Sequence, residues 1–103
     1  MGNLRSTSLR ESVKAMGMPC EVNSILKLSS TQGYPKELVL RSQHQTVKSG
    51  YRILPMDVPI PLVDGEWLAH ADVVIRQLTW ENGETKLVFE IHRVYESPFS
   101  MKG

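Results

Sequence analysis

The feature that most constrains the fold is the dipeptide Asn82-Gly83, which separates two long runs rich in β-branched and aromatic residues. Asparagine and glycine both accept the positive φ angles of a two-residue turn, which makes this pair the strongest short-range hairpin signal. The flanking runs, residues 66–80 and 84–96, cover almost a third of the chain. We therefore predict an all-β fold dominated by one long C-terminal antiparallel hairpin.

The preceding residues predict several shorter strands separated by turns. Apolar residues alternate with polar ones over 20–28, and this period of two is typical of a strand. Further short strands are expected over 37–41 and 51–54. Residues 42–50 are polar and indicate a loop or an edge strand. Five or six strands with frequent turns suggest a small antiparallel barrel or an open sandwich.

The segment 55–63 contains Pro55, Pro59 and Pro61. Proline has no backbone N–H to donate, so this segment cannot be a central strand. We expect it to run extended along an edge or over a face of the sheet. Its apolar side chains Val58, Ile60 and Leu62 are expected to pack inward.

Charge is distributed unevenly between a short tail and the rest of the chain. Residues 1–15 contain three basic residues and one acidic residue, although the net charge of the whole chain is only +1. We predict that this segment is a disordered tail or a short helix, and that residues 16–103 form a single β domain. A domain that is not basic argues against nucleic-acid binding without sequence preference.

The chain has one cysteine, Cys20, which excludes an intramolecular disulfide and a cysteine-rich metal site. A single thiol suits a reducing compartment. No apolar run is long enough to span a membrane, and no secretory signal pattern is present. We therefore expect a cytoplasmic protein, and no motif indicates a cofactor.

Two registers of the hairpin are open, because the turn length decides which side chains face each other. A two-residue turn places Asp72 opposite Arg93, whereas a three-residue loop with a glycine bulge places it opposite His92. A bulge between Ala71 and Val74 would combine the two registers. In every case Asp72 faces a basic residue. The three-residue loop gives the cleaner apolar face, which comprises Trp67, Ala69, Ala71, Val73, Ile75, Leu87, Phe89 and Ile91.

His70, Asp72, His92 and Arg93 are expected near one end of the hairpin, close to Tyr95. A carboxylate beside a histidine can orient the imidazole for acid–base chemistry, or supply ligands to a metal ion. The four residues are therefore candidate ligand-binding residues. The alternative is a polar strip on a solvated sheet face. No nucleophile lies in a recognisable elbow motif, so no residue is assigned a catalytic role.

A second candidate set consists of Arg41, Lys48, Tyr51 and Arg52. Basic residues interleaved with an aromatic side chain can bind the phosphates and bases of single-stranded nucleic acid. The alternative is a solvated edge strand, on which lysine and arginine prevent unwanted pairing.

Several segments together resemble a known family. These are Met16–Pro19 before the first strand, Asp57–Leu62, Trp67, and the turn sequence Trp80–Thr85. They resemble an uncharacterised family of small proteins from Gram-positive, Bacillus-like bacteria, over residues 16 to about 98. The resemblance implies a cytoplasmic bacterial protein and brings no activity or site residues.

We interpret the chain as a small non-enzymatic binding or interaction module that forms a homodimer. The long hairpin exceeds what the other short strands can cover, which leaves an exposed strand edge or the face bearing Trp67 and Trp80 for self-association. One alternative is a small enzyme or metal site on the His/Asp cluster. Another is a binder of single-stranded nucleic acid. No membrane association is expected, and the partner, whether protein or small molecule, is unspecified.

Overall fold

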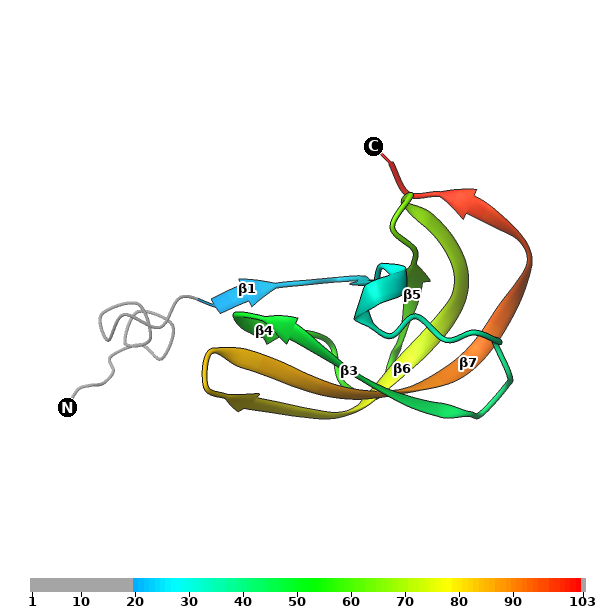
Figure 1. The fold of residues 1–103 in the computed structure, drawn as a ribbon. Coiled ribbons are helices and arrows are strands. Elements are labelled where there is room, and N and C mark those ends of the chain that lie inside the picture. Colours follow the sequence, from blue (N-terminus) through cyan, green and yellow to red (C-terminus); the bar gives the residue numbers. More distant parts are fainter. Residues whose placement is uncertain (1–19, 103) are drawn as a thin grey trace.

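The computed structural model describes residues 20–102, which form a mostly β structure without an α-helix (Figure 1). Five strands make the main sheet in the order β2-β5-β6-β7-β3, and β1 and β4 make a small separate sheet. The elements are β1 (Cys20–Val22), β2 (Leu26–Lys27), a 3-10 turn η1 (Ser30–Gln32), β3 (Gln43–Ser49), β4 (Tyr51–Ile53), β5 (Pro59–Val63), β6 (Leu68–Glu81) and β7 (Glu84–Ser100). The all-β class is confirmed, and the predicted tail of residues 1–15 lies outside the described residues.

The main sheet is mixed and open. β2 pairs with β5 in parallel, whereas the other pairs of the main sheet are antiparallel. β2 and β3 stand at opposite ends of the strand order, and no pairing joins them among the described strands. Of the two predicted architectures, a closed antiparallel barrel or an open sandwich, the barrel does not form, because β2, at one end of the strand order, contributes only two residues. Within residues 20–102, no helix has the length and apolarity needed to cross a membrane.

The hairpin turn has the two-residue form. Glu81 pairs with Glu84, and Asn82 and Gly83 between them have φ angles of 54° and 77°. These positive angles match the right-handed twist of the flanking strands. The turn predicted from the Asn82-Gly83 dipeptide is confirmed.

Bulges combine the two predicted registers in one hairpin. Near the turn, Gln77 faces Val88 in the register of the two-residue turn. The register shifts at Arg76, and the pairs farther from the turn are those expected for the three-residue loop. A second shift makes His92 the extra residue on β7 and returns Asp72 to a position opposite Arg93. This second bulge lies between Ala71 and Val74, where the sequence analysis allowed one. The predicted pairing of Asp72 with a basic residue is confirmed.

The bulges keep the apolar side chains of the hairpin on one face. Seven of the eight residues predicted for that face are buried: Ala69, Ala71, Val73, Ile75, Leu87, Phe89 and Ile91. The exception is Trp67, which is 38% exposed and has a φ angle of 68° in the turn before β6. The core is completed from the other strands and connections by Leu26, Leu28, Leu54, Ile60 and Leu62, with Tyr34, Leu38 and Leu78 packed against it.

β5 pairs with β6, and its prolines lie in the part of β5 that has no second neighbouring strand among the described residues. β2 pairs only with Leu62 and Val63, so Pro59 and Pro61 have a partner on the β6 side alone. The expectation that the segment cannot be a central strand is therefore wrong for Leu62 and Val63, where β5 lies between β2 and β6, and the two prolines lie outside that doubly paired part. Ile60 and Leu62 are buried as predicted, but Val58 is 47% exposed because it precedes the strand.

Two strand predictions from the first half of the chain are wrong in detail. The predicted strand 20–28 is interrupted, because β1 pairs with β4 while β2 pairs with β5. Residues 37–41 form no strand. Ser42 donates a hydrogen bond to the carbonyl of Val39, and Arg41 has a φ angle of 68°, so the chain turns there. The polar segment that follows is the edge strand β3, which pairs with β7 along its whole length.

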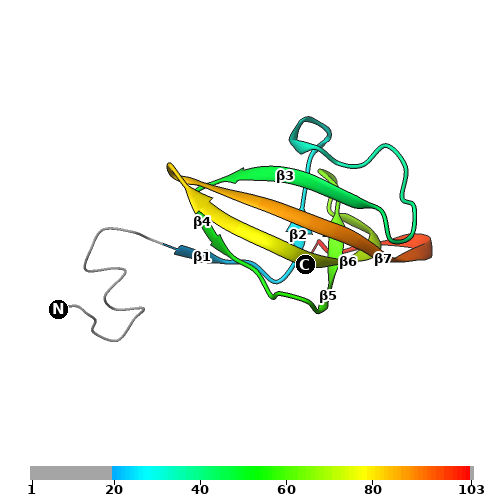
Figure 2. The ribbon, with the colours of Figure 1, turned by 90° about the horizontal axis from the view of Figure 1, so that it is seen from below.

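The small sheet lies beside the turn end of the hairpin (Figure 1, Figure 2). The hydroxyl of Thr85 on β7 accepts a hydrogen bond from the backbone N–H of Arg52 and donates one to the carbonyl of Gly50. The indole N–H of Trp80 donates to the carbonyl of Arg52. These bonds join β4 to the hairpin, and β1 follows because it pairs with β4.

Candidate functional site

The structure separates the four residues of the predicted His/Asp cluster. Asp72 accepts hydrogen bonds from the Nε of Arg93, at 3.3 Å, and from the hydroxyl of Tyr95. His92 is exposed at the bulge of β7. His70 is bound to a different carboxylate, that of Asp64. Residues 20–102 contain no group of three His, Cys, Asp or Glu side chains that could hold a metal ion.

Asp64 organises the turn that precedes β6. Its Oδ1 accepts hydrogen bonds from the backbone N–H groups of Glu66, at 2.8 Å, and Leu68, at 3.0 Å. Its Oδ2 lies 2.7 Å from the Nε2 of His70. Burial by itself would raise the pKa of the Asp64 carboxyl, but the hydrogen bonds from His70, Leu68 and Glu66 outweigh it and lower that pKa.

His70 and Tyr34 line an open hollow of about 750 Å³. The ring of Tyr34 meets that of His70 edge to face, with 6.0 Å between the centroids. The Tyr34 hydroxyl is buried and has no hydrogen-bond partner within residues 20–102, and burial followed by the nearby charge of Asp64 raises its pKa to about 12. The Asp64 contact orients the imidazole and leaves Nδ1 as the acceptor nitrogen of the neutral ring.

Sequence analysis missed Asp64 as the partner of His70. It grouped the histidine with Asp72, two residues away on the same strand. The signal was available, because an Asp-Gly turn at the start of a strand brings a carboxylate back alongside the first residues of that strand.

The predicted nucleic-acid set is also divided. Arg41 lies beside Arg76, Glu90 and His92 at the bulge region. The hydroxyl of Tyr51 accepts a hydrogen bond from the backbone N–H of the turn glycine Gly83, and its ring packs against Trp80.

Lys48 and Arg52 do lie together, in a cavity that also contains Lys27 and Trp67. Sequence analysis did not include Lys27 or Trp67. Only the parallel pairing of β2 with β5 brings Lys27 to this cavity.

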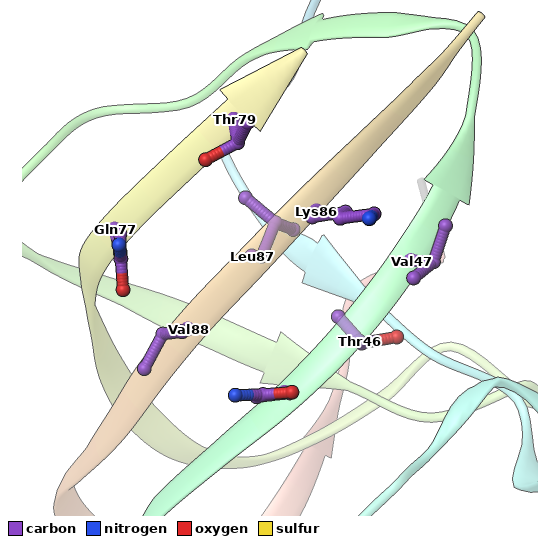
Figure 3. Close-up of a pocket in the computed structure, with 8 residues that line it drawn as sticks. Thr46, Val47, Gln77, Thr79, Lys86, Leu87 and Val88 are labelled. Atoms are coloured by element: carbon purple, nitrogen blue, oxygen red, sulfur yellow. The ribbon is translucent and has the colours of Figure 1, made fainter. Parts of the chain in front are cut away.

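The outer face of β6, β7 and β3 is open and carries two rows of cross-strand neighbours. Gln45, Val88 and Gln77 form one row, and Val47, Lys86 and Thr79 form the other. The six side chains line an open hollow of about 460 Å³. Figure 3 shows Val47, Val88 and Lys86, together with Gln77 and Thr79, along the three strands. Lys86 is the charged residue of the two rows, and its Nζ lies 3.0 Å from the carboxylate of Glu81. We call these six residues the outer face.

Comparison with protein families identifies the family of this chain. The model of a family described as a domain of unknown function, DUF2584, matches residues 16–96. The chain belongs to this family. The match confirms the resemblance predicted over residues 16 to about 98. No curated protein gives a significant match.

A solved structure supports the fold. The chain is similar to the protein ytmB from Bacillus subtilis, a structural genomics target, with a TM-score of 0.65 and 22% sequence identity. The similarity covers 78% of this chain and 95% of ytmB. At this level of identity it extends to the fold alone, and neither comparison brings an activity to the DUF2584 family.

Proposed function

We propose that this DUF2584 protein is a small non-enzymatic interaction module that forms a homodimer through the outer face of its sheet. The observation that carries the proposal is that the two rows of the outer face contain no unpaired charge and are not covered by any segment within residues 20–102. Val47, at the β3 end of its row, is 45% exposed. Interfaces are depleted of charged residues at their core, and the charged side chain of the two rows, Lys86 on the middle strand β7, is neutralised by its ion pair with Glu81.

The chemistry of the outer face suits contact with a second copy. Glutamine and threonine side chains both donate and accept hydrogen bonds, so each can pair with the same residue type across a two-fold axis. The valines supply apolar area between them. Two such sheets pack face to face at a separation of about 10 Å.

The edges of the sheet are less suitable for self-association. On β5, Pro59 and Pro61 lack N–H groups, and on β3 the η1 turn covers part of the edge, where the hydroxyl of Thr46 donates to the carbonyl of Gln32. The tryptophans lie at opposite ends of the long strand, because Trp67 precedes β6 and Trp80 is near its far end. Trp67 contacts Lys27, and Trp80 contacts Tyr51.

The substitution Val47→Glu tests this proposal. In a two-fold dimer it would introduce two carboxylates into the interface, and we expect dimer affinity to fall at least tenfold, about 1.4 kcal/mol. Sedimentation equilibrium over a wide range of concentration measures the change, and circular dichroism confirms that the variant is folded.

The matched control is Val39→Glu, because Val39 is also exposed but lies in the loop before β3. It should leave the dimer unchanged. A wild-type protein that stays monomeric throughout would contradict the homodimer. A dimer that Val47→Glu does not weaken would contradict the assignment of the outer face.

A further inference from the structure

A cavity of about 290 Å³ lies on the inner side of β3, beside the small sheet. Three cationic side chains line it: Lys27 from β2, Lys48 from β3 and Arg52 from β4. The carboxylate among its lining residues belongs to Glu21, whose side chain is 62% exposed. We call this the cationic cavity. It is distinct from the outer face, since Lys48 points to the opposite side of β3 from Val47.

Lys48 is the most buried of the three cations, with 9% of its surface exposed. Its Nζ donates a hydrogen bond to the carbonyl oxygen of Lys27, at 2.6 Å. An ammonium group has three hydrogens to donate, and this carbonyl is the one acceptor that residues 20–102 provide. Burial, followed by the charges of Arg52 and Lys27, lowers the pKa of the Lys48 ammonium.

Arg52 is fixed in position at the cavity wall. Its Nε donates to the carbonyl of Ser49 at 2.9 Å, and its Nη1 donates to Oδ1 of Asn23 at 3.2 Å. The same Nη1 lies 3.6 Å from a carboxylate oxygen of Glu21. The guanidinium therefore needs little reorganisation to bind a ligand, which lowers the entropic cost of binding.

Lys27 adds the third charge from the opposite wall. Its Nζ lies 4.8 Å from the centre of the Trp67 ring, an arrangement in which the electron-rich ring face attracts the ammonium. Three cations and one solvent-exposed carboxylate leave the cavity with an excess of positive charge. An excess of buried like charge is unfavourable without a compensating anion.

We propose that the cationic cavity binds a small molecule through a phosphate group. A phosphate carries up to two negative charges and several acceptor oxygens, which suit one guanidinium and two ammonium groups. The volume accommodates a phosphate with a small attached group. It does not accommodate a nucleic-acid strand, and Arg41 and Tyr51 of the predicted nucleic-acid set lie elsewhere.

Calorimetric titration of the full chain with inorganic phosphate tests the proposal, followed by glycerol phosphate as a simple phosphomonoester. We expect saturable binding of both, and at least a tenfold loss of affinity in Lys48→Met. Because removal of a buried lysine can change stability, Arg52→Gln serves as a second variant with the same expectation. Proton–nitrogen NMR spectra establish that each variant is folded.

The control is Lys102→Met, which removes an exposed lysine near the C-terminal end of β7 and should bind phosphate like the wild type. Absence of binding at millimolar phosphate would overturn the proposal, and so would equal losses in the control and in the cavity variants. Tighter binding of a single-stranded oligonucleotide through Lys48 and Arg52 would replace the small ligand with a nucleic acid.

Discussion

At the scale of single residues, Asp64 determines the geometry around the start of β6. Its side chain accepts from Glu66, Leu68 and His70, and its backbone carbonyl accepts from the N–H of Trp67. The same turn places Trp67 at a φ of 68°, a conformation that is unfavourable for a large side chain. The carboxylate therefore stabilises a backbone shape that the sequence around it does not favour.

The substitution Asp64→Asn should destabilise the protein in a pH-dependent way. Asparagine retains a carbonyl oxygen for the turn but loses the charge, and hydrogen bonds to charged groups contribute roughly 1.5–3 kcal/mol. Because the pKa of Asp64 is lowered by folding, its stabilisation is present above the unfolded pKa of about 3.9 and is lost as pH falls through the folded value. Urea unfolding at neutral pH and near pH 2 measures the difference between variant and wild type.

The difference should be largest at neutral pH and should vanish at the acid end. Asp57→Asn is the matched control, since Asp57 is an exposed carboxylate paired with Arg76 and should contribute little. A destabilisation by Asp64→Asn that persists in acid would show that turn geometry, rather than charge, is responsible.

At the scale of elements, the hairpin was predictable because its signals are local. The turn residues, the period of two and the choice between two registers can all be read from residues adjacent in sequence. The bulge between Ala71 and Val74 was foreseen as one option, but the register shift at Arg76 was not, because the turn favours one register and the apolar face favours the other. The strand predicted over 37–41 does not form, since its apolar residues Val39 and Leu40 have no partner strand among residues 20–102 and remain exposed.

Gly83→Ala isolates the conformational demand of the hairpin turn. A Cβ at this position would meet no atom within 4 Å, so the cost arises from the φ of 77° alone. We expect a loss of about 1–2 kcal/mol, the usual cost of a left-handed conformation for an L-residue, measured as a lower urea midpoint.

Gly83→Asn is the comparison, because asparagine adopts left-handed conformations more readily and should lose less stability than alanine. If both variants were as stable as the wild type, the turn would have to change to a different turn type without any loss of stability.

At the scale of the whole molecule, the parts that could not be predicted depend on parallel pairings between distant segments. Sequence analysis placed Lys48 and Arg52 in one candidate set, and the structure does bring them together. It did not connect them to Lys27, because the pairing of β2 with β5 has no local signature. For the same reason β1 was assigned to one continuous strand rather than to the small sheet with β4.

Thr85→Val tests how the small sheet is joined to the rest. Valine keeps the shape of the buried side chain but removes both hydrogen bonds to the segment around β4, and leaves the N–H of Arg52 unsatisfied. We expect a loss of about 1–3 kcal/mol. Amide hydrogen exchange should show reduced protection in β1 and β4 at temperatures where the main sheet is still protected.

Thr31→Val is the control, because the Thr31 hydroxyl is exposed and water can replace its contact with Ser29. Equal loss of protection in both sheets would contradict a local role for Thr85.

The strand order also has a consequence for how the protein is made. Among the strands of residues 20–102, β3 pairs only with β7, which comes last in chain order, and β2 pairs only with β5. Each of these early strands can pair only after a partner much farther along the sequence has been synthesised. Loop closure over a large sequence separation slows folding. β2, β5 and β6 can pair with one another before β7 is synthesised, whereas β3 can join the main sheet only afterwards. The apolar side chains of β6 are therefore only partly covered until β7 has been made.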